Sequence, residues 1–230
     1  MDMSETLIRP DGTPLVYDRF VPEKPAHGAG VMFMHGFQSD RNATKAQFLD
    51  SACRRLNIPF IRYDAYAHGE SGGAWPDFTI GHAVHDALLV LDELTHGPQI
   101  VVGSSMGGWV ALRLLEERPE RIAGMVGIAT APDFTAHLTP NGDYTRALID
   151  EGPNQYVMDE DWTFTGPVHL LQGKLDTSVP WETAGRVAAK FPDPARVVIT
   201  LVNDGDHRLN RPEDLDLQEK AILDVLKRTL

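Results

Sequence analysis

The sequence has little that would suit an extracellular, membrane-spanning or metal-dependent protein. Among its 230 residues there is one cysteine, Cys53, which cannot form an internal disulfide and lies in a segment expected to be helical. No run approaches the roughly 20 apolar residues of a transmembrane helix. The first 30 residues lack the apolar core of a secretory signal. We therefore expect a cytoplasmic protein without stable membrane insertion.

Positive charge is also scarce. Lys and Arg number 21 against 33 Asp and Glu, which gives a formal net charge of −12. Binding to nucleic acid or to anionic membrane surfaces requires clustered basic side chains, so nucleic acid is not an expected partner. The nine histidines show no HExxH spacing and no cysteine set accompanies them. We expect neither a metal nor another cofactor.

What the sequence does contain is an alternation of short apolar, β-branched runs with amphipathic segments of helical period. This order is typical of a mostly parallel sheet with helices on both faces, and the length suits a single α/β domain over residues 1–230. An antiparallel edge strand is expected at 15–20, after the Asp11-Gly12 turn. Buried strands are expected at 30–34, 58–63, 99–102, 122–128, 168–171 and 196–201, and helices at 44–56, 80–95, 106–117, 181–190 and 213–228.

The strand expected at 99–102 leads into Gly103-Ser104-Ser105-Met106-Gly107 and then into a helix. A sharp strand–turn–helix of this GxSxG form lifts the serine hydroxyl clear of the sheet. Gly103 and Gly107 lack the Cβ atoms that would clash in so tight a turn. Ser105 is therefore the predicted nucleophile.

A second GxSxG match, from Gly69 to Gly73, surrounds Ser71. It leads into Ala74-Trp75-Pro76, which cannot begin a helix directly after the serine. We expect Ser71 in a glycine-rich loop at a strand end and not at a catalytic turn.

A nucleophilic serine at such a turn requires an orienting acid and a general base, which follow it along the chain in that order. Asp176 comes just after the strand at 168–171, so its carboxylate is expected at the carboxyl edge of the sheet; Asp133, after the preceding strand, is the alternative acid. His207 follows the last strand. Its imidazole, with an ordinary pKa of about 6.5, is suited to take and return a proton near neutrality.

The negative charge that develops on a reacting carbonyl oxygen is stabilised by two N–H donors, which together form an oxyanion hole. The backbone N–H of Met106, at the start of a helix, is one predicted donor of this oxyanion hole. The other is that of Phe37, in His35-Gly36-Phe37-Gln38 after the first buried strand. His35 is expected to support this loop through hydrogen bonds and not to act as a base.

Residues 132–166 interrupt the alternation with mixed turn signals and scattered aromatic residues. An insertion at this point lies over the carboxyl ends of the strands, where ligands bind in open α/β sheets, so we predict a small cap. Trp162 and Tyr144 are its predicted substrate-binding side chains. The alternative for the segment is a surface loop that does not contact substrate. The alternative for its aromatic residues is a small satellite core that anchors the segment.

Several of these motifs resemble a known superfamily. His35-Gly36-Phe37, the turn from Gly103 to Gly108, Asp176 before Val179-Pro180, and Asp206-His207 resemble the α/β-hydrolase superfamily across essentially the whole chain. More narrowly, Gly97-Pro98-Gln99, Gly127 to Ala131, Val179-Pro180-Trp181 and Asp206-His207-Arg208 resemble the mitochondrial acyl-protein thioesterases that also cleave acyl glucuronides, and their bacterial relatives. The resemblance implies an α/β-hydrolase fold and hydrolysis of an ester or thioester through an acyl-enzyme. It also implies a small molecule or an acylated protein as substrate.

The residues by themselves leave three functions open. A serine esterase or thioesterase is favoured by the complete order Ser105, Asp176, His207. The same fold also supports other chemistry, such as C–C bond hydrolysis, a cofactor-free lyase or a perhydrolase. A non-catalytic receptor for a small molecule is the third, and the intact set of three groups argues against it.

Overall fold

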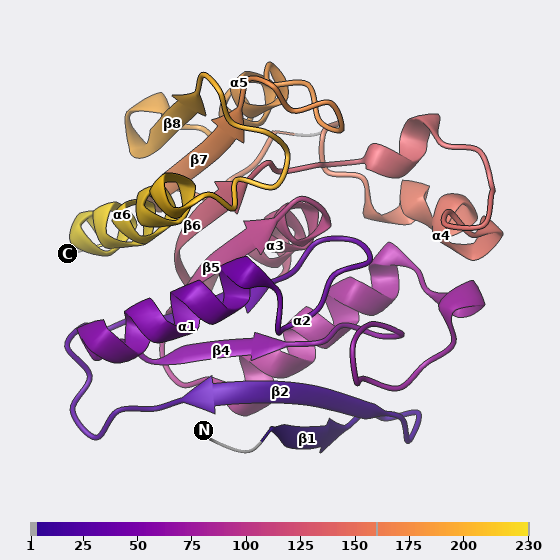
Figure 1. Ribbon diagram of the computed structural model, residues 1–230, viewed down its shortest axis with the longest axis horizontal. Coiled ribbons are helices and arrows are strands. Elements are labelled where there is room, and N and C mark those ends of the chain that lie inside the picture. The colour runs from indigo at the N-terminus through magenta and orange to yellow at the C-terminus, as the bar shows by residue number, and fades with distance from the viewer. Residues whose placement is uncertain (1–3, 160, 230) are drawn as a thin grey trace.

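The computed structural model describes residues 4–159 and 161–229, and a single large sheet runs through this part of the chain (Figure 1). The order of the eight strands is β1-β2-β4-β3-β5-β6-β7-β8. All pairs from β4 to β8 are parallel, and the pairs β1–β2 and β2–β4 are antiparallel. The strands are Glu5–Ile8 (β1), Pro14–Phe20 (β2), Gly30–Met34 (β3), Phe60–Tyr63 (β4), Gln99–Ser104 (β5), Ile122–Ile128 (β6), Val168–Gly173 (β7) and Val197–Val202 (β8).

One strand position differs from the sequence prediction. The strand expected at the edge, 15–20, is present as β2, but β1 lies outside it, with Thr6 opposite Val16. The prediction of an edge position for 15–20 is therefore wrong. Glu5–Ile8 has only four residues, most of them exposed, so it carries no clear alternation of apolar and polar side chains.

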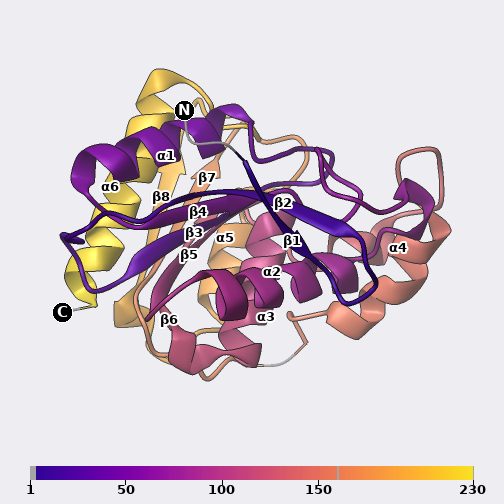
Figure 2. The same cartoon turned by 90° about the horizontal axis from the view of Figure 1, so that it is seen from below.

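Helices cover both faces of the sheet, as the alternation predicts. Figure 2 shows α1 and α6 on one side and α2 and α3 on the other. Successive side chains of β3 point to opposite faces of the sheet. Val31 and Phe33 pack towards α1 and α6, whereas Met32 and Met34 pack towards α2 and α3. The helices are Thr44–Leu56 (α1), Ile80–Leu94 (α2), Met106–Glu117 (α3), Arg146–Glu151 (α4), Thr183–Ala188 (α5) and Pro212–Arg228 (α6). In the described ranges, none of the helices is both long and apolar enough to cross a membrane.

In its described residues, the segment between β6 and β7 forms three short helices: Phe134–His137 (η3), α4 and Gly152–Gln155 (η4). It lies beside the carboxyl ends of the strands (Figure 1). The Trp109 Nε1–H donates to the Gln155 carbonyl at 2.8 Å, and the Gly81 N–H donates to the Glu151 carboxylate at 3.0 Å. These bonds join the segment to α3 and α2, so it is fixed above the edge where the loops carrying the predicted site residues emerge.

Candidate active site

Ser105 occupies the turn between β5 and α3 in a strained backbone conformation. Its φ of 54° and ψ of −115° are rarely adopted by a residue with a Cβ atom. Two backbone hydrogen bonds hold the turn: the Ser105 N–H donates to the Ile128 carbonyl at 2.9 Å, and the Ala131 N–H donates to the Ser105 carbonyl at 3.2 Å. Gly107 is required here, because a Cβ on it would lie 2.2 Å from the Met34 carbonyl oxygen. Close backbone packing therefore sets the position of the serine.

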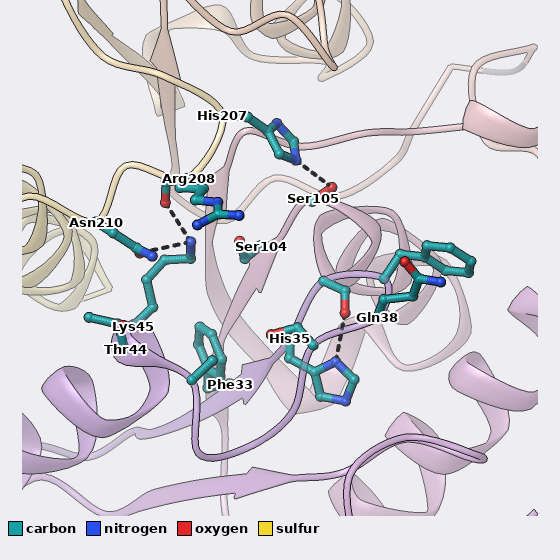
Figure 3. A pocket seen from close by; sticks show the side chains of 14 residues that line it. Phe33, His35, Gln38, Thr44, Lys45, Ser104, Ser105, His207, Arg208 and Asn210 are labelled. Carbon is teal, nitrogen blue, oxygen red and sulfur yellow. Dashed lines mark hydrogen bonds between the residues drawn. The ribbon is translucent and has the colours of Figure 1, made fainter. Parts of the chain in front are cut away.

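A histidine and an aspartate from two other strand ends meet at this serine. The His207 Nε2 atom lies 3.1 Å from the Ser105 Oγ atom (Figure 3). The His207 Nδ1 atom lies 2.8 Å from the Asp176 Oδ2 atom. Since an ionised carboxylate can only accept, Nδ1–H donates to Asp176, and Nε2 is left to accept the hydroxyl proton. The structure brings together the three side chains that the sequence predicts, in the series serine, imidazole, carboxylate.

The Asp176 carboxylate is fully buried, and both of its oxygens accept hydrogen bonds. Its Oδ1 atom accepts the backbone N–H groups of Ser178 and Val179, each at 2.8 Å, and its Oδ2 atom also accepts from the Gln172 side chain at 2.9 Å. These bonds leave the carboxylate one orientation, towards the imidazole. The buried acid is thus fully hydrogen-bonded.

The loops that carry Asp176 and His207 are packed backbone to backbone. A Cβ on Gly173 would lie 2.4 Å from the Gly205 carbonyl oxygen, so glycine is required for this approach. The Leu175 N–H donates to the Gly205 carbonyl at 2.9 Å. The acid and the base are therefore held at a fixed separation by the ends of β7 and β8.

The loop after β3 passes close to the serine. A Cβ on Gly36 would lie 3.4 Å from the Ser105 Cβ atom, which places the neighbouring Phe37 backbone at the same turn as Met106. No turn or loop hydrogen bond of the described residues uses the N–H of Phe37 or of Met106. In the described part of the chain, the two N–H groups predicted to form the oxyanion hole thus lie beside Ser105 without a backbone acceptor from a turn or loop.

Two buried histidines hold this loop in place. The His35 Nε2 atom accepts the Ala65 N–H at 3.1 Å, and the His68 Nε2 atom accepts the Gln38 N–H at 3.3 Å. Their Nδ1 atoms lie 2.8 Å from the carbonyl oxygens of Gly36 and Tyr66 and donate to them. Burial lowers the pKa of His35 and lowers that of His68 to about 4, so both rings are neutral near pH 7 and keep an acceptor nitrogen.

The other sequence candidates have different contacts. The Ser71 Oγ atom accepts the Val16 N–H at 2.8 Å and donates to the Asp64 carbonyl at 2.7 Å, which makes it part of the loop structure. The alternative acid, Asp133, accepts the backbone N–H groups of Val157 and Met158 instead of an imidazole. Its carboxylate therefore ties together the two ends of the segment between β6 and β7.

The two aromatic residues predicted to bind substrate lie in different places. Tyr144 is half-buried and stacks on Phe37, with ring centroids 5.5 Å apart and planes at 22°. Trp162 is buried, donates from Nε1 to the Val157 carbonyl at 3.0 Å, and packs edge-on against Phe191 at 4.7 Å. Tyr144 is therefore next to the candidate oxyanion loop, whereas the contacts of Trp162 are those of the anchoring alternative.

Two residues of the cavity beside Ser105 were not assigned a role from sequence, and neither was the support that His68 gives to the loop after β3 from 30 positions away. Lys45 and Arg208 line the same cavity of about 300 Å³ as Ser105 and His207. The contacts join residues distant in sequence, so no local pattern identifies them.

The site combines a serine at a strained turn with an imidazole that a buried aspartate orients. This arrangement is suited to the hydrolysis of carboxylic esters and thioesters. Together with the parallel sheet beneath it, this arrangement fits that chemistry, and relatives of the chain are named thioesterases and hydrolases. The chain is an ester or thioester hydrolase.

The family follows from comparison with known proteins. Residues 31–154 match the model of the alpha/beta hydrolase fold family, which is more than half of the chain. The chain belongs to this family, and the predicted fold class is confirmed.

Relatives cover nearly the whole chain. The mitochondrial palmitoyl-protein thioesterase ABHD10 of mouse is 32% identical over 240 residues, covering 93% of this chain and 79% of the relative. The solved structure of mouse alpha/beta hydrolase domain-containing protein 10 has a TM-score of 0.91 at 30% identity and covers 100% of both chains. A putative hydrolase from Agrobacterium vitis has a TM-score of 0.88 at 35% identity, covering 97% of this chain and 98% of its own.

Proposed function

We propose that this protein hydrolyses acyl esters or thioesters through an acyl-enzyme on Ser105, with His207 as the general base and Asp176 as the orienting acid. The observation that carries the proposal is the hydrogen-bonded series from Ser105 Oγ through both nitrogens of His207 to Asp176 Oδ2. The series begins at Ser105, where a strained backbone turn directs the hydroxyl towards His207. Catalytic groups in this order need no metal and no organic cofactor.

In the first half of the reaction, the Ser105 Oγ atom attacks the acyl carbon and its proton passes to His207 Nε2. The tetrahedral intermediate then collapses, the bond from the acyl carbon to the leaving sulfur or oxygen breaks, and the leaving atom takes the proton from His207. In the second half, water attacks the acyl-enzyme and gives a proton to His207. The acid product leaves as that proton returns to Ser105.

The backbone N–H groups of Phe37 and Met106 are the proposed oxyanion hole. Met106 is the first residue of α3, so its N–H has no partner within the helix and carries the positive end of the helix dipole. Phe37 is positioned by the histidine-supported loop. Donors fixed before the reaction stabilise the developing charge without reorganisation.

The cap, residues 132–166 apart from residue 160, is proposed to receive the acyl group. A cavity of about 530 Å³ lies between it and α5 and is mostly apolar, with side chains that include Phe134, Leu138, Met158 and Val179. Ala131, whose N–H donates to the Ser105 carbonyl, also lines it. A mostly apolar cavity of this size, whose wall includes a residue bonded to the Ser105 backbone, fits an acyl chain. The name of the mouse relative, a palmitoyl-protein thioesterase, agrees with a long acyl group, and an acylated protein is one proposed substrate.

The cytoplasmic location expected from the sequence stays a prediction. The mammalian relatives are named as mitochondrial proteins. Fractionation of cells that express the full chain, followed by detection of the protein in each compartment, is the measurement that decides it.

The function is tested by covalent labelling and turnover. A fluorophosphonate is expected to label Ser105, and Ser105→Ala is expected to abolish both labelling and the hydrolysis of octanoyl esters and thioesters, because no other group supplies the nucleophile. Mass spectrometry of the labelled peptide identifies the residue.

Ser71→Ala is the matched control, since Ser71 stands in the second GxSxG match and takes part in no step of the reaction. It loses two hydrogen bonds, so we expect a loss of about 1–2 kcal/mol in the free energy of unfolding but continued labelling and turnover. Inactivity of Ser71→Ala in a folded protein, with activity left in Ser105→Ala, would show that the nucleophile is wrongly assigned.

A further inference from the structure

The loop between β8 and α6 carries His207, and its shape depends first on local bonds. Leu209 in this loop has a φ of 46°, in the left-handed region that residues with a Cβ atom rarely adopt. The Asp206 carboxylate accepts the backbone N–H groups of Arg208 and Leu209 at 3.0 and 2.9 Å. These bonds fix the turn after His207, but the distance from His207 to Ser105 depends on contacts with other segments.

Two segments hold the loop on either side of His207. The loop after β7 donates the Leu175 N–H to the Gly205 carbonyl at 2.9 Å. From α6, the fully buried side chain of Gln218 donates to the Leu209 carbonyl at 2.7 Å. Neither contact acts on the residue that directly follows His207.

Lys45 provides the third contact, from the first turn of α1. Its Nζ atom donates to the Arg208 carbonyl at 2.5 Å and to the Asn210 side-chain oxygen at 3.2 Å (Figure 3). Arg208 directly follows His207 in the chain, so the ammonium group holds the backbone beside the base. The base is therefore held from three segments: the loop after β7, α6 and the first turn of α1.

The position of Lys45 is unfavourable for a lysine by local rules. A positive charge in the first turn of a helix opposes the helix dipole, and the first turn of α1 contains no acidic residue that would offset it. Burial lowers the pKa of Lys45 to about 8, and the nearby Asp206 carboxylate opposes this effect, so the group is mostly charged at neutral pH. The contact with the loop of His207 is the favourable interaction that the structure shows for this ammonium group.

We propose that Lys45 is a positioning residue for the general base. Its bond to the Arg208 carbonyl keeps the His207 Nε2 atom within reach of the nucleophile in both halves of the reaction. This inference rests on the proposed function. His207 accepts a proton from the serine hydroxyl in the first half and from water in the second, so its ring must keep one place throughout. Lys45 acts through the backbone and transfers no proton itself.

Removal of the ammonium group tests the proposal. In Lys45→Ala we expect kcat and kcat/KM for octanoyl esters to fall together by about 10- to 100-fold, with KM nearly unchanged, because only the transition state requires the aligned imidazole. Propylamine has the atoms that this substitution removes, and the cavity of about 300 Å³ that Lys45 lines has room for it. Propylamine should restore part of the lost rate. Tetramethylammonium, which has the charge but no N–H group, should not.

Two further variants serve as controls. Lys45→Met keeps the apolar stem, so it should show the same fall in kcat without rescue, and it decides the question if Lys45→Ala does not fold. Lys220→Ala removes an exposed lysine of α6 and should keep full activity, with no response to propylamine. The inference is overturned if kcat is unchanged in the folded Lys45 variants, if only KM rises, or if propylamine restores nothing in Lys45→Ala.

The position of the ring can also be observed without substrate, which separates the inference from the proposed function. The His207 Nδ1–H proton, bonded to a buried carboxylate, should give a low-field signal in proton NMR that His207→Gln lacks. A wild type that hydrolyses neither octanoyl esters nor octanoyl thioesters would overturn the proposed function. In that case, loss of the signal in Lys45→Ala and its return with propylamine would support the inference, and an unchanged signal would overturn it too.

Discussion

At the scale of single residues, two neutral histidines support the loop after β3, which carries the proposed oxyanion donor Phe37, and this support depends on their protonation. His35 and His68 each use one ring nitrogen to accept a backbone N–H and the other to donate to a carbonyl. A protonated ring has no acceptor nitrogen. The hydrogen bonds that position Phe37 therefore require both rings to stay neutral, which burial ensures near neutral pH.

The same burial makes the stability depend on pH. The pKa of His68 is lowered to about 4, whereas the ordinary value in an unfolded chain is about 6.5. The unfolded chain therefore binds a proton between these values that the folded protein does not, and the stability present above about pH 6.5 is lost as the pH falls towards 4.

We expect His68→Gln, whose amide oxygen replaces the acceptor nitrogen, to reduce this pH dependence. Between pH 7 and pH 4.5 the free energy of unfolding of the wild type should fall by roughly 2 kcal/mol more than that of the variant. Urea unfolding at the two pH values measures both. His85→Gln, at an exposed position of α2, is the control. If the free energies of unfolding of the wild type and of His68→Gln differ by the same amount at both pH values, the prediction is contradicted.

At the scale of elements, the cap shows why aromatic residues in one segment can have different roles. Phe37 is packed among Trp75, Phe134 and Tyr144, so part of the cap surface lies directly against the oxyanion loop. Trp162 belongs instead to the core near α5, where it contacts Phe191. Substrate contact and anchoring can therefore be separated by substitution.

We expect Tyr144→Ala to alter the chain-length profile and Trp162→Ala to lower stability. Tyr144 stacks on Phe37, whose ring also contacts Phe134 in the wall of the proposed acyl cavity. Its loss should therefore change discrimination between acyl chains by roughly 1–3 kcal/mol, measured as relative kcat/KM across a series of esters. Removal of the buried Trp162 ring should cost about 3–5 kcal/mol in the free energy of unfolding, with the profile kept. The reverse result, an altered profile for Trp162→Ala and none for Tyr144→Ala, would exchange the two roles.

At the scale of the whole molecule, a buried ion pair joins segments that are far apart in sequence. Arg9, in the turn between β1 and β2, binds Asp86 of α2 through two hydrogen bonds of 2.6 and 2.9 Å. The Asp86 carboxylate also accepts the Tyr66 N–H at 2.6 Å, and Arg9 donates to the Pro14 carbonyl. Both side chains are almost completely buried. The antiparallel end of the sheet is thereby connected to the helical layer.

Removal of one partner leaves the other charge buried and unpaired. We expect Arg9→Met or Asp86→Leu to lower the free energy of unfolding by about 3–5 kcal/mol, measured by denaturant titration. The double variant should recover part of this loss, because no isolated charge remains. If the double variant loses as much free energy of unfolding as the two single variants together, the two groups do not act as a pair.

The sequence by itself determined much of the sheet and the helices, because their signals are local. Short apolar runs predicted β3 and β6, and the helical period predicted α1 and α3, at the bounds that the structure has. The turn around Ser105 is equally local, since its glycines and the following helix stand within a few residues of the serine. Strand β1 and the cap helices are too short to carry such a period, so they were not assigned.

Only the tertiary structure decided which side chains meet. The ends of parallel strands all come to one edge, so the sequence left two acids, Asp133 and Asp176, at suitable places. Backbone packing between the loops after β7 and β8 turns Asp176 towards His207, while Asp133 accepts N–H groups from Val157 and Met158 within its own segment. The convergence of Lys45 and Arg208 beside Ser105 likewise joins positions 163 residues apart. The direction of a loop side chain depends on contacts with distant segments, and these exist only once the chain has folded.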